Sequence, residues 1–106
     1  MGFFDFWKQT DINQGVKAFR AVSGAVLLDV RTPQEYREGR IPGSRNVPLQ
    51  QLDSVQEEIE DRDTPLFVYC RSGNRSGQAV GLLESMGYTN VTNIGGILSY
   101  TGTIER

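Results

Sequence analysis

Residues 70–76 read Cys-Arg-Ser-Gly-Asn-Arg-Ser and include the only cysteine of the 106-residue chain. This stretch follows an apolar run and precedes a run with helical spacing, so we expect Cys70 where a strand ends and a helix begins. The first N–H groups of a helix lack internal partners, and the helix dipole favours an anion there. A thiolate is such an anion. With Arg71 and Arg75 nearby, we expect the pKa of Cys70 to fall from about 8.5 into the range of roughly 3.5–7.5, which predicts a nucleophile at neutral pH.

A second interpretation of Cys70 is structural. A lone cysteine at a strand end is commonly a small buried apolar residue without chemistry of its own. The arginines and the turn Ser72-Gly73-Asn74 favour the reactive interpretation. The sequence therefore predicts that Cys70 is catalytic, within a polar and basic loop that leads to Ser76.

The composition excludes several other kinds of catalysis. A single cysteine excludes an internal disulfide and a resolving thiol, so Cys70 must pass whatever it accepts to an outside acceptor. The chain has no histidine, which excludes Ser-His pairs, Cys-His pairs and histidine-ligated metals. We expect neither a metal nor a cofactor.

Strand and helix patterns place the cysteine loop at one edge of a sheet. Residues 66–70 form a short, uninterrupted, β-rich run, which is typical of a strand covered on both faces. Apolar residues then recur at helical spacing from about residue 75 to residue 86, and a glycine follows where a helix commonly ends. Residues 25–30 form another buried strand, with Asp29 and Arg31 at its carboxyl end. Open α/β sheets place their ligand sites at this edge.

The rest of the chain alternates between helical and strand patterns. Thr32 and Glu35 form a capping box with Pro33 at the first helical position, which explains both polar residues structurally. The other expected elements are a helix from 10 or 11 to about 22, a short helix from 33 to 39, a strand over 45–47, a helix through Leu52, Val55 and Ile59, a strand over 91–94, and an end of the core capped by Ile97, Leu98 and Tyr100. Such alternation implies parallel strands, right-handed crossovers and a small α/β domain.

Length and charge fit one folded domain. The chain has 38% apolar and 23% charged residues, and its net charge of −2 gives no reason to expect nucleic acid as a partner. Residues 1–9 are rich in aromatic side chains but lack the features of a signal peptide and are too short to span a bilayer. We expect residues 1–9 to pack as an edge strand on a single domain of residues 10–106. We also expect a cytoplasmic monomer or weak homodimer without a membrane partner.

The loop Cys-Arg-Ser-Gly-Asn-Arg-Ser resembles the active-site loop of the rhodanese-like sulfurtransferases. Other stretches resemble further motifs of that family and occur in the same order. They are residues 26–36 with Asp29-Val30-Arg31, residues 41–48 with Ile41-Pro42-Gly43, and residues 87–97 with Gly95-Gly96. The resemblance covers roughly residues 10–102. The chain has Arg40 where the family commonly has histidine, and Tyr100 where it often has tryptophan.

The resemblance implies a three-layer α/β/α domain with a five-stranded, mostly parallel sheet. It also implies a thiosulfate sulfurtransferase, in which Cys70 takes the outer sulfur of thiosulfate or a similar donor and holds it as a persulfide. Cyanide or a thiol would then accept the sulfur. The partners would be a small anionic sulfur donor and a thiophilic small molecule or protein thiol. The predicted substrate-binding residues are Arg71, Ser72, Gly73, Asn74, Arg75 and Ser76.

Two other functions fit parts of this pattern. Related phosphatases and arsenate reductases use a similar cysteine loop with Cys-x5-Arg spacing, whereas Cys70 and Arg75 have Cys-x4-Arg spacing. The shorter loop suits a sulfur atom better than a tetrahedral oxyanion. The other alternative is a non-catalytic persulfide-carrying or regulatory module, and the presence of Cys70 with a complete loop argues against it.

Overall fold

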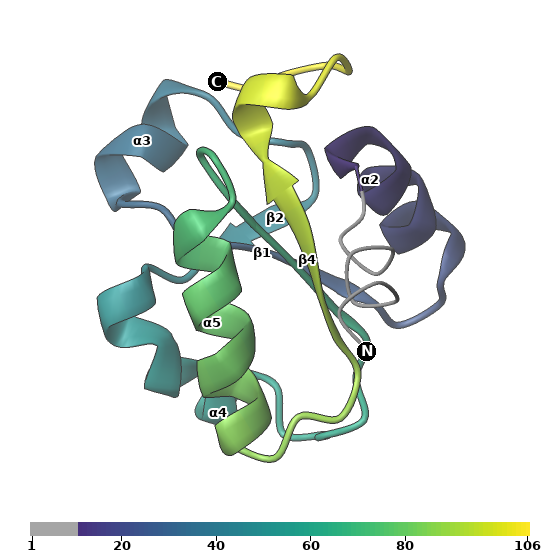
Figure 1. The fold of residues 1–106 in the computed structure, drawn as a ribbon, viewed down its shortest axis with the longest axis vertical. Coiled ribbons are helices and arrows are strands. Elements are labelled where there is room, and N and C mark those ends of the chain that lie inside the picture. Colours follow the sequence, from purple (N-terminus) through teal and green to yellow (C-terminus); the bar gives the residue numbers. More distant parts are fainter. Residues whose placement is uncertain (1–10) are drawn as a thin grey trace.

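The computed structural model describes residues 11–106. Their strands form one parallel sheet, and helices lie around it (Figure 1). Its strands lie in the order β2-β1-β3-β4, and each neighbouring pair is parallel. The strand that ends in Cys70 is therefore a central strand, as expected for a continuous apolar run. The strands are β1 (Val26–Asp29), β2 (Ser44–Asn46), β3 (Leu66–Cys70) and β4 (Val91–Gly96).

The sheet has four strands within residues 11–106, so the expected five-stranded sheet is wrong for this part of the chain. Between residue 11 and β1 the chain forms a helix and a turn, which leaves no extended segment for another strand. After β4 the chain forms a 3₁₀ helix, η2 (Ile97–Ser99), instead of pairing again with the sheet. The edge strand expected at residues 1–9 lies outside the described residues.

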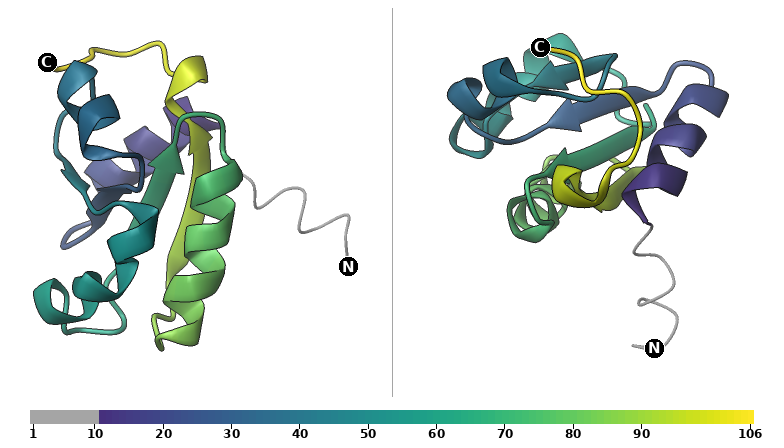
Figure 2. Two further views of the ribbon diagram at one scale, coloured as in Figure 1. Left: turned by 90° about the vertical axis from the view of Figure 1, so that its left-hand side faces the viewer. Right: turned by 90° about the horizontal axis from the view of Figure 1, so that it is seen from above.

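Helices cover both faces of the sheet (Figure 2). Helix α2 (Ile12–Ala21), which Asp11 caps, packs on one face, and α5 (Asn74–Ser85) packs on the other. Helix α3 (Pro33–Glu38) begins at the predicted capping box. The helix expected through residues 52–59 is instead a 3₁₀ helix, η1 (Leu49–Ser54), followed by one α-turn, α4 (Val55–Glu58). No helix of the described part of the chain combines the length and the apolar character needed to cross a membrane.

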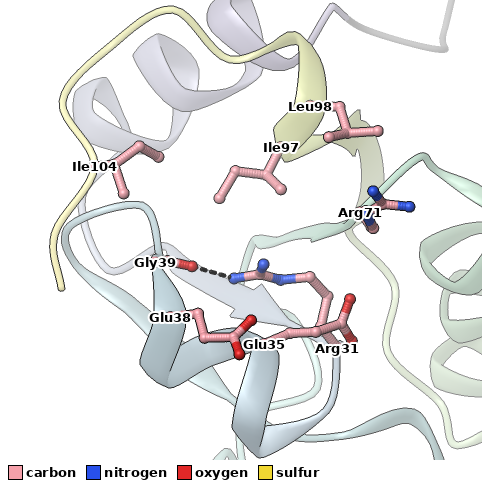
Figure 3. Close-up of a pocket in the computed structure, with 8 residues that line it drawn as sticks. All are labelled: Arg31, Glu35, Glu38, Gly39, Arg71, Ile97, Leu98 and Ile104. Carbon is pink, nitrogen blue, oxygen red and sulfur yellow. Dashed lines mark hydrogen bonds between the residues drawn. The ribbon is translucent and has the colours of Figure 1, made fainter.

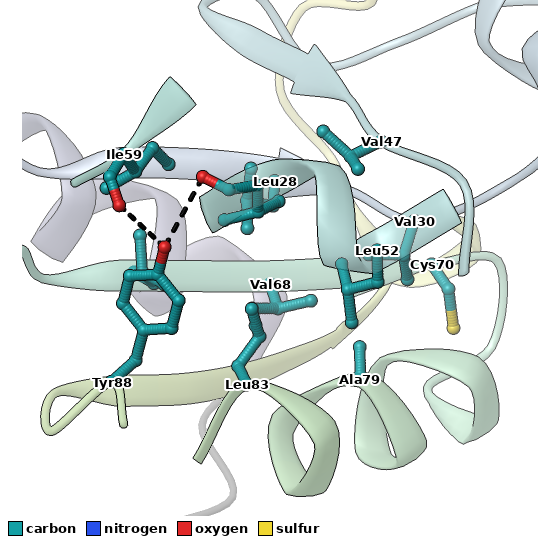
Figure 4. Close-up of a cluster of buried hydrophobic side chains, with 12 residues drawn as sticks. Leu28, Val30, Val47, Leu52, Ile59, Val68, Cys70, Ala79, Leu83 and Tyr88 are labelled. Atoms are coloured by element: carbon teal, nitrogen blue, oxygen red, sulfur yellow. Dashed lines mark hydrogen bonds between the residues drawn. The ribbon is translucent and has the colours of Figure 1, made fainter. Parts of the chain in front are cut away.

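The side chains of β3 alternate between two apolar clusters. Val68 and Cys70 belong to the cluster beneath η1, α4 and α5, where Ala79 and Leu83 of α5 also pack (Figure 4). Tyr69 belongs to the cluster on the α2 side of the sheet. The alternation follows from strand geometry, which turns successive side chains to opposite faces. Cys70 thus points toward the amino end of α5.

The carboxyl-terminal segment crosses the sheet edge where the parallel strands end. Arg40 and Glu105 exchange two backbone hydrogen bonds of 2.9 and 2.8 Å, and their side chains form an ion pair of 3.3 Å. Ile97 and Tyr100 pack on the cluster beside α2. Leu98, which we expected to cap the core with them, is 65% exposed and faces outward from the loop edge. That part of the prediction is wrong because a short 3₁₀ helix can bury only one side.

We predict that Gly15→Ala destabilises the fold by about 1–3 kcal/mol, the usual cost of overpacking a filled core. A Cβ at Gly15 would lie 2.4 Å from the Cβ of the fully buried Ile94, so α2 or β4 would have to move. Urea unfolding followed by circular dichroism measures the change. Gly81→Ala is the matched control. Gly81 lies in α5 with open space around it, so alanine there should raise the free energy of unfolding by about 0.5–1 kcal/mol. Equal effects of the two substitutions would contradict this account of the packing of α2.

Candidate active site

Cys70 is the last residue of β3, and three residues separate it from the first turn of α5. Its side chain is 1% exposed, and its sulfur accepts a hydrogen bond of 3.0 Å from the N–H of Gly73. Gly73 has φ +108°, a left-handed conformation that side chains disfavour, so glycine is required for this turn. The turn directs a backbone donor at the sulfur, as predicted for a cysteine before a helix.

Ser76 supplies a second polar contact to the sulfur. Its hydroxyl oxygen lies 3.4 Å from the sulfur of Cys70, and the residue is fully buried. The serine stands in the first turn of α5, so its position follows from the start of the helix. The hydroxyl can donate to a thiolate or accept from a thiol.

These contacts lower the pKa of Cys70. Burial is the largest single influence and raises the pKa, but hydrogen bonds from the hydroxyl and backbone of Ser76 and from the backbones of Gly73 and Ser72 together outweigh it. The direction agrees with the prediction from sequence. The cause differs in part, because local hydrogen-bond donors dominate and the neighbouring guanidinium groups are not among the main contributors.

Arg75 does not point freely into solvent. Its guanidinium forms a two-pronged ion pair with Glu35, with N–O distances of 2.7 and 3.0 Å. The same carboxylate accepts a hydrogen bond of 3.0 Å from the N–H of Thr32 in the capping box. The hydrogen bond from Arg75 is the main reason that the pKa of Glu35 falls from 4.5 to about 2. The pair ties the first turn of α5 to α3, and the prediction that Arg75 binds an anionic donor stays a prediction.

The other loop residues line the rim. Arg71 and Ser72 are exposed, and Asn74 is exposed as the first residue of α5. Within residues 11–106, no ion pair involves the guanidinium of Arg71. Arg71 is therefore better placed than Arg75 to attract a negatively charged molecule from solvent.

Asn93 is a site residue that our sequence analysis missed. Its side-chain oxygen lies 2.7 Å from the hydroxyl of Ser76 and accepts a hydrogen bond of 2.9 Å from the N–H of Gly95. The pairing of β3 with β4 shifts by one residue here, from Val68 opposite Asn93 to Tyr69 opposite Gly95. A polar side chain directly before the buried Ile94 of β4 was the available signal.

Gly96 lets β4 approach the cysteine loop closely. A Cβ at Gly96 would lie 2.3 Å from the carbonyl oxygen of Arg71 and 2.6 Å from the Cα of Ser72. Both are backbone atoms, so any larger residue would displace the loop. The N–H of Leu98 donates to the carbonyl of Arg71 at 3.2 Å and holds the loop from the same side.

A cavity of about 220 Å³ opens between α3, η2 and the carboxyl-terminal segment (Figure 3). Arg31 and Arg71 contribute charge to its walls, and Ile97 and Ile104 contribute apolar surface. Arg31 is buried and pairs with Asp29 through an N–O distance of 2.6 Å. Asp29 ends β1 and Arg31 follows it into the cavity wall, so both residues lie at the carboxyl end of this strand as predicted. Within residues 11–106, no cluster of acidic or cysteine side chains has the size of a metal site.

Comparison with known proteins identifies relatives of this arrangement. A profile described as "Rhodanese-like domain" matches residues 12–102. Thiosulfate sulfurtransferase PspE of Escherichia coli is 38% identical over 71 residues, covering 66% of this chain and 68% of that protein. The human thiosulfate:glutathione sulfurtransferase is 32% identical over 104 residues, covering 86% and 89%. A solved structure titled "rhodanese with anions from E. coli" has a TM-score of 0.72 at 32% identity, covering 77% of this chain and 98% of that one.

We predict that Ser76→Ala raises the pKa of Cys70, because the thiolate loses its side-chain donor while the backbone donors remain. The rate of alkylation by iodoacetamide at pH 7 should fall several-fold, and its pH profile should move upward. Ser85→Ala, at the exposed end of the same helix, is the control and should leave the profile unchanged. If Ser76→Ala left the pH profile of alkylation unchanged, the hydroxyl of Ser76 would not contribute to the pKa of Cys70.

We predict that the ion pair of Glu35 and Arg75 stabilises the fold above about pH 4.5 and that this contribution is lost as the pH falls toward 2. The sign follows because the carboxyl pKa is lower in the folded chain than in the unfolded chain. Urea unfolding of wild type and Glu35→Gln should therefore differ most at pH 7, differ less at pH 3, and converge only as the pH approaches 2. Glu84→Gln, an exposed change on α5, should show no such pH dependence. A stability difference that is equal at both pH values would contradict the assignment.

Proposed function

Since this chain belongs to the rhodanese-like sulfurtransferase family, we propose that it transfers sulfane sulfur from thiosulfate or a similar anionic donor through a persulfide on Cys70. The observation that carries the proposal is the pair of contacts at the sulfur, from the N–H of Gly73 and the hydroxyl of Ser76. They favour a thiolate in an otherwise buried position. A structural cysteine has no need of such donors.

The first half-reaction uses the thiolate as the nucleophile. Cys70 attacks the outer sulfur of thiosulfate, an S–S bond to the protein forms, and the S–S bond within thiosulfate breaks with its electron pair leaving on sulfite. One thiolate and one thiosulfate dianion thus become one persulfide anion and one sulfite dianion, so charge balances. Arg71 at the rim attracts the donor, and the loop N–H groups stabilise the negative charge that stays on the protein.

The second half-reaction releases the sulfur to an acceptor. Cyanide, or a thiolate, attacks the outer sulfur of the persulfide, and the bond to Cys70 breaks with its electron pair returning to the cysteine. The products are thiocyanate, or a new persulfide, together with the original thiolate. Because the chain has one cysteine, the acceptor must come from outside. The name of the human relative includes glutathione, which supports a small thiol as one acceptor class.

The geometry gives less support to a phosphatase or arsenate reductase. Those reactions need an arginine whose guanidinium donates hydrogen bonds to a tetrahedral oxyanion bound at the cysteine. Arg75, which lies one residue closer to the cysteine than the arginine of those enzymes, is held by both oxygens of Glu35. A bidentate pair of this kind is among the stronger hydrogen-bonded interactions in proteins, so an oxyanion would have to displace it.

We predict that Cys70→Ser abolishes sulfite release from thiosulfate in the presence of cyanide. Arg71→Ala should lower kcat/KM for thiosulfate roughly two- to five-fold and weaken its salt dependence, as expected for an exposed charge. Arg20→Ala, an exposed arginine on α2, should have no effect. Turnover that survives Cys70→Ser would overturn the mechanism, and turnover of a phosphate ester with none of thiosulfate would favour the phosphatase alternative.

A further inference from the structure

Asn93 is the polar side chain of β4 that reaches the cysteine loop. Successive side chains of a strand face opposite sides of the sheet. Val91 packs on the cluster beneath α5 and Ile94 belongs to the cluster beside α2, so Asn93 faces the α5 side. Cys70 belongs to the same side. The partly buried amide of Asn93 therefore lies against the first turn of α5.

Two contacts of opposite kind fix the orientation of this amide. The oxygen of Asn93 accepts a hydrogen bond of 2.9 Å from the N–H of Gly95, and its nitrogen donates to the carbonyl of Gly73 at 3.4 Å. A reversed amide would set a donor against a donor and an acceptor against an acceptor. The hydroxyl of Ser76, 2.7 Å from the amide oxygen, thus meets an acceptor and must donate to it.

Ser76 has one proton to share between Asn93 and the sulfur. A hydroxyl carries a single O–H donor, and Ser76 is fully buried. Its distance of 2.7 Å to Asn93 lies at the preferred O–H···O length of about 2.7–2.8 Å, whereas the sulfur of Cys70 is 3.4 Å away. Beside a neutral thiol the hydroxyl therefore donates to Asn93. A thiolate attracts the proton more strongly, because hydrogen bonds to a charged acceptor are the stronger ones.

We propose that Asn93 is a positioning residue that competes with Cys70 for the hydroxyl proton of Ser76 and so limits how readily the thiolate forms. For catalysis the inference rests on the proposed function, in which the same sulfur attacks the donor and later leaves as a thiolate. The nucleophilicity of a thiolate falls as the pKa of its thiol falls, and a thiol with a pKa near the ambient pH attacks best. A hydroxyl committed to the sulfur alone would give a more abundant but weaker nucleophile. Competition by Asn93 keeps Cys70 between these limits.

The charged surroundings of Cys70 stay the same when Asn93 is replaced. Asparagine is neutral, and β4 itself has no charged residue. A shift in the titration of the thiol would therefore come from the amide. On the other elements around the cysteine, the charged groups toward the loop are Asp29 and Arg31 at the end of β1, Glu35 of α3, the exposed Asp53 of η1, Arg71 in the loop and Arg75 of α5.

The test is the pH profile of Cys70 alkylation by iodoacetamide in wild type and Asn93→Leu. Leucine has the branched shape of asparagine but no hydrogen-bonding atoms, so the hydroxyl loses its nearest acceptor. The carbonyl of Gly73, at 3.0 Å, remains as the weaker competitor. The midpoint of the profile should fall by about 0.5–1 pH unit. Thr92→Val, on the opposite face of the same strand, is the matched control and should leave the midpoint unchanged.

The direction of the shift separates competition from a bracing role. If Asn93 only held the loop in shape, Asn93→Leu would disturb the donors to the sulfur, and the midpoint would rise toward the free-cysteine value of about 8.5. Asn93→Asp keeps the acceptor, so its midpoint should stay at or above that of wild type. A midpoint of Asn93→Leu at or above that of wild type would overturn the proposal. Circular dichroism checks the fold, and Asn93→Ala, with the same expected direction, replaces Asn93→Leu if leucine prevents folding.

A double-mutant cycle tests whether Asn93 acts through Ser76. In the Ser76→Ala background there is no hydroxyl proton to compete for, so Asn93→Leu should leave the midpoint unchanged. An equal fall of the midpoint in both backgrounds would show that Asn93 acts on the sulfur directly, and the proposal would be wrong.

Sulfite release from thiosulfate tests the catalytic consequence. At a pH high enough to ionise Cys70 in both proteins, Asn93→Leu should release sulfite roughly two- to three-fold more slowly than wild type, because its thiolate is the weaker nucleophile. Equal plateau rates would overturn the catalytic part of the inference. Alkylation needs no sulfur transfer, so midpoints that shift as expected in a protein that releases no sulfite would overturn the proposed function and support the competition for the proton of Ser76.

Discussion

The burial of a polarisable thiol is the constraint on which the rest of this domain depends. Cys70 is 1% exposed, so water cannot solvate a negative charge on its sulfur, and a thiolate there depends on hydrogen-bond donors from the protein. The N–H of Gly73 and the hydroxyl of Ser76 are those donors. They reach the sulfur only if the chain turns sharply after β3, which a left-handed glycine allows, and only if β4 approaches closely, which Gly96 allows.

The two arginines of the loop have different electrostatic surroundings. Arg75 is neutralised by Glu35 and joins α5 to α3, so its main effect is on the position of the helix that carries Ser76. Arg71 remains exposed and contributes positive charge at the rim of the loop. Arg71 and Arg75 thus have different roles, because within residues 11–106 only Arg75 of the two forms an ion pair with a carboxylate, that of Glu35.

Local patterns in the sequence predicted most of what positions the site. The apolar run of β3, the capping box of α3 and the glycine turn after Cys70 each depend on neighbouring residues, and each appears as expected. Contacts between distant segments were not predictable in this way. The partners Glu35 and Arg75 are 40 residues apart, and Ser76 and Asn93 are 17 apart. Such pairs depend on how the strands are ordered, which periodicity alone does not specify.

The contact of Asn93 with Ser76 shows how the site can change charge without moving. The serine has one hydroxyl proton and three acceptors nearby: the sulfur at 3.4 Å, the oxygen of Asn93 at 2.7 Å and the carbonyl of Gly73 at 3.0 Å. When the sulfur is a thiolate, the proton turns toward it, and the oxygen of Asn93 keeps its hydrogen bond from Gly95. No buried acceptor is then left without a donor, which keeps the cost of the turn small. In the proposed cycle a persulfide would carry the charge on its outer sulfur, and the hydroxyl proton of Ser76 could then return to the oxygen of Asn93. Rotation of one buried hydroxyl thus fits the two charge states of a group-transfer cycle.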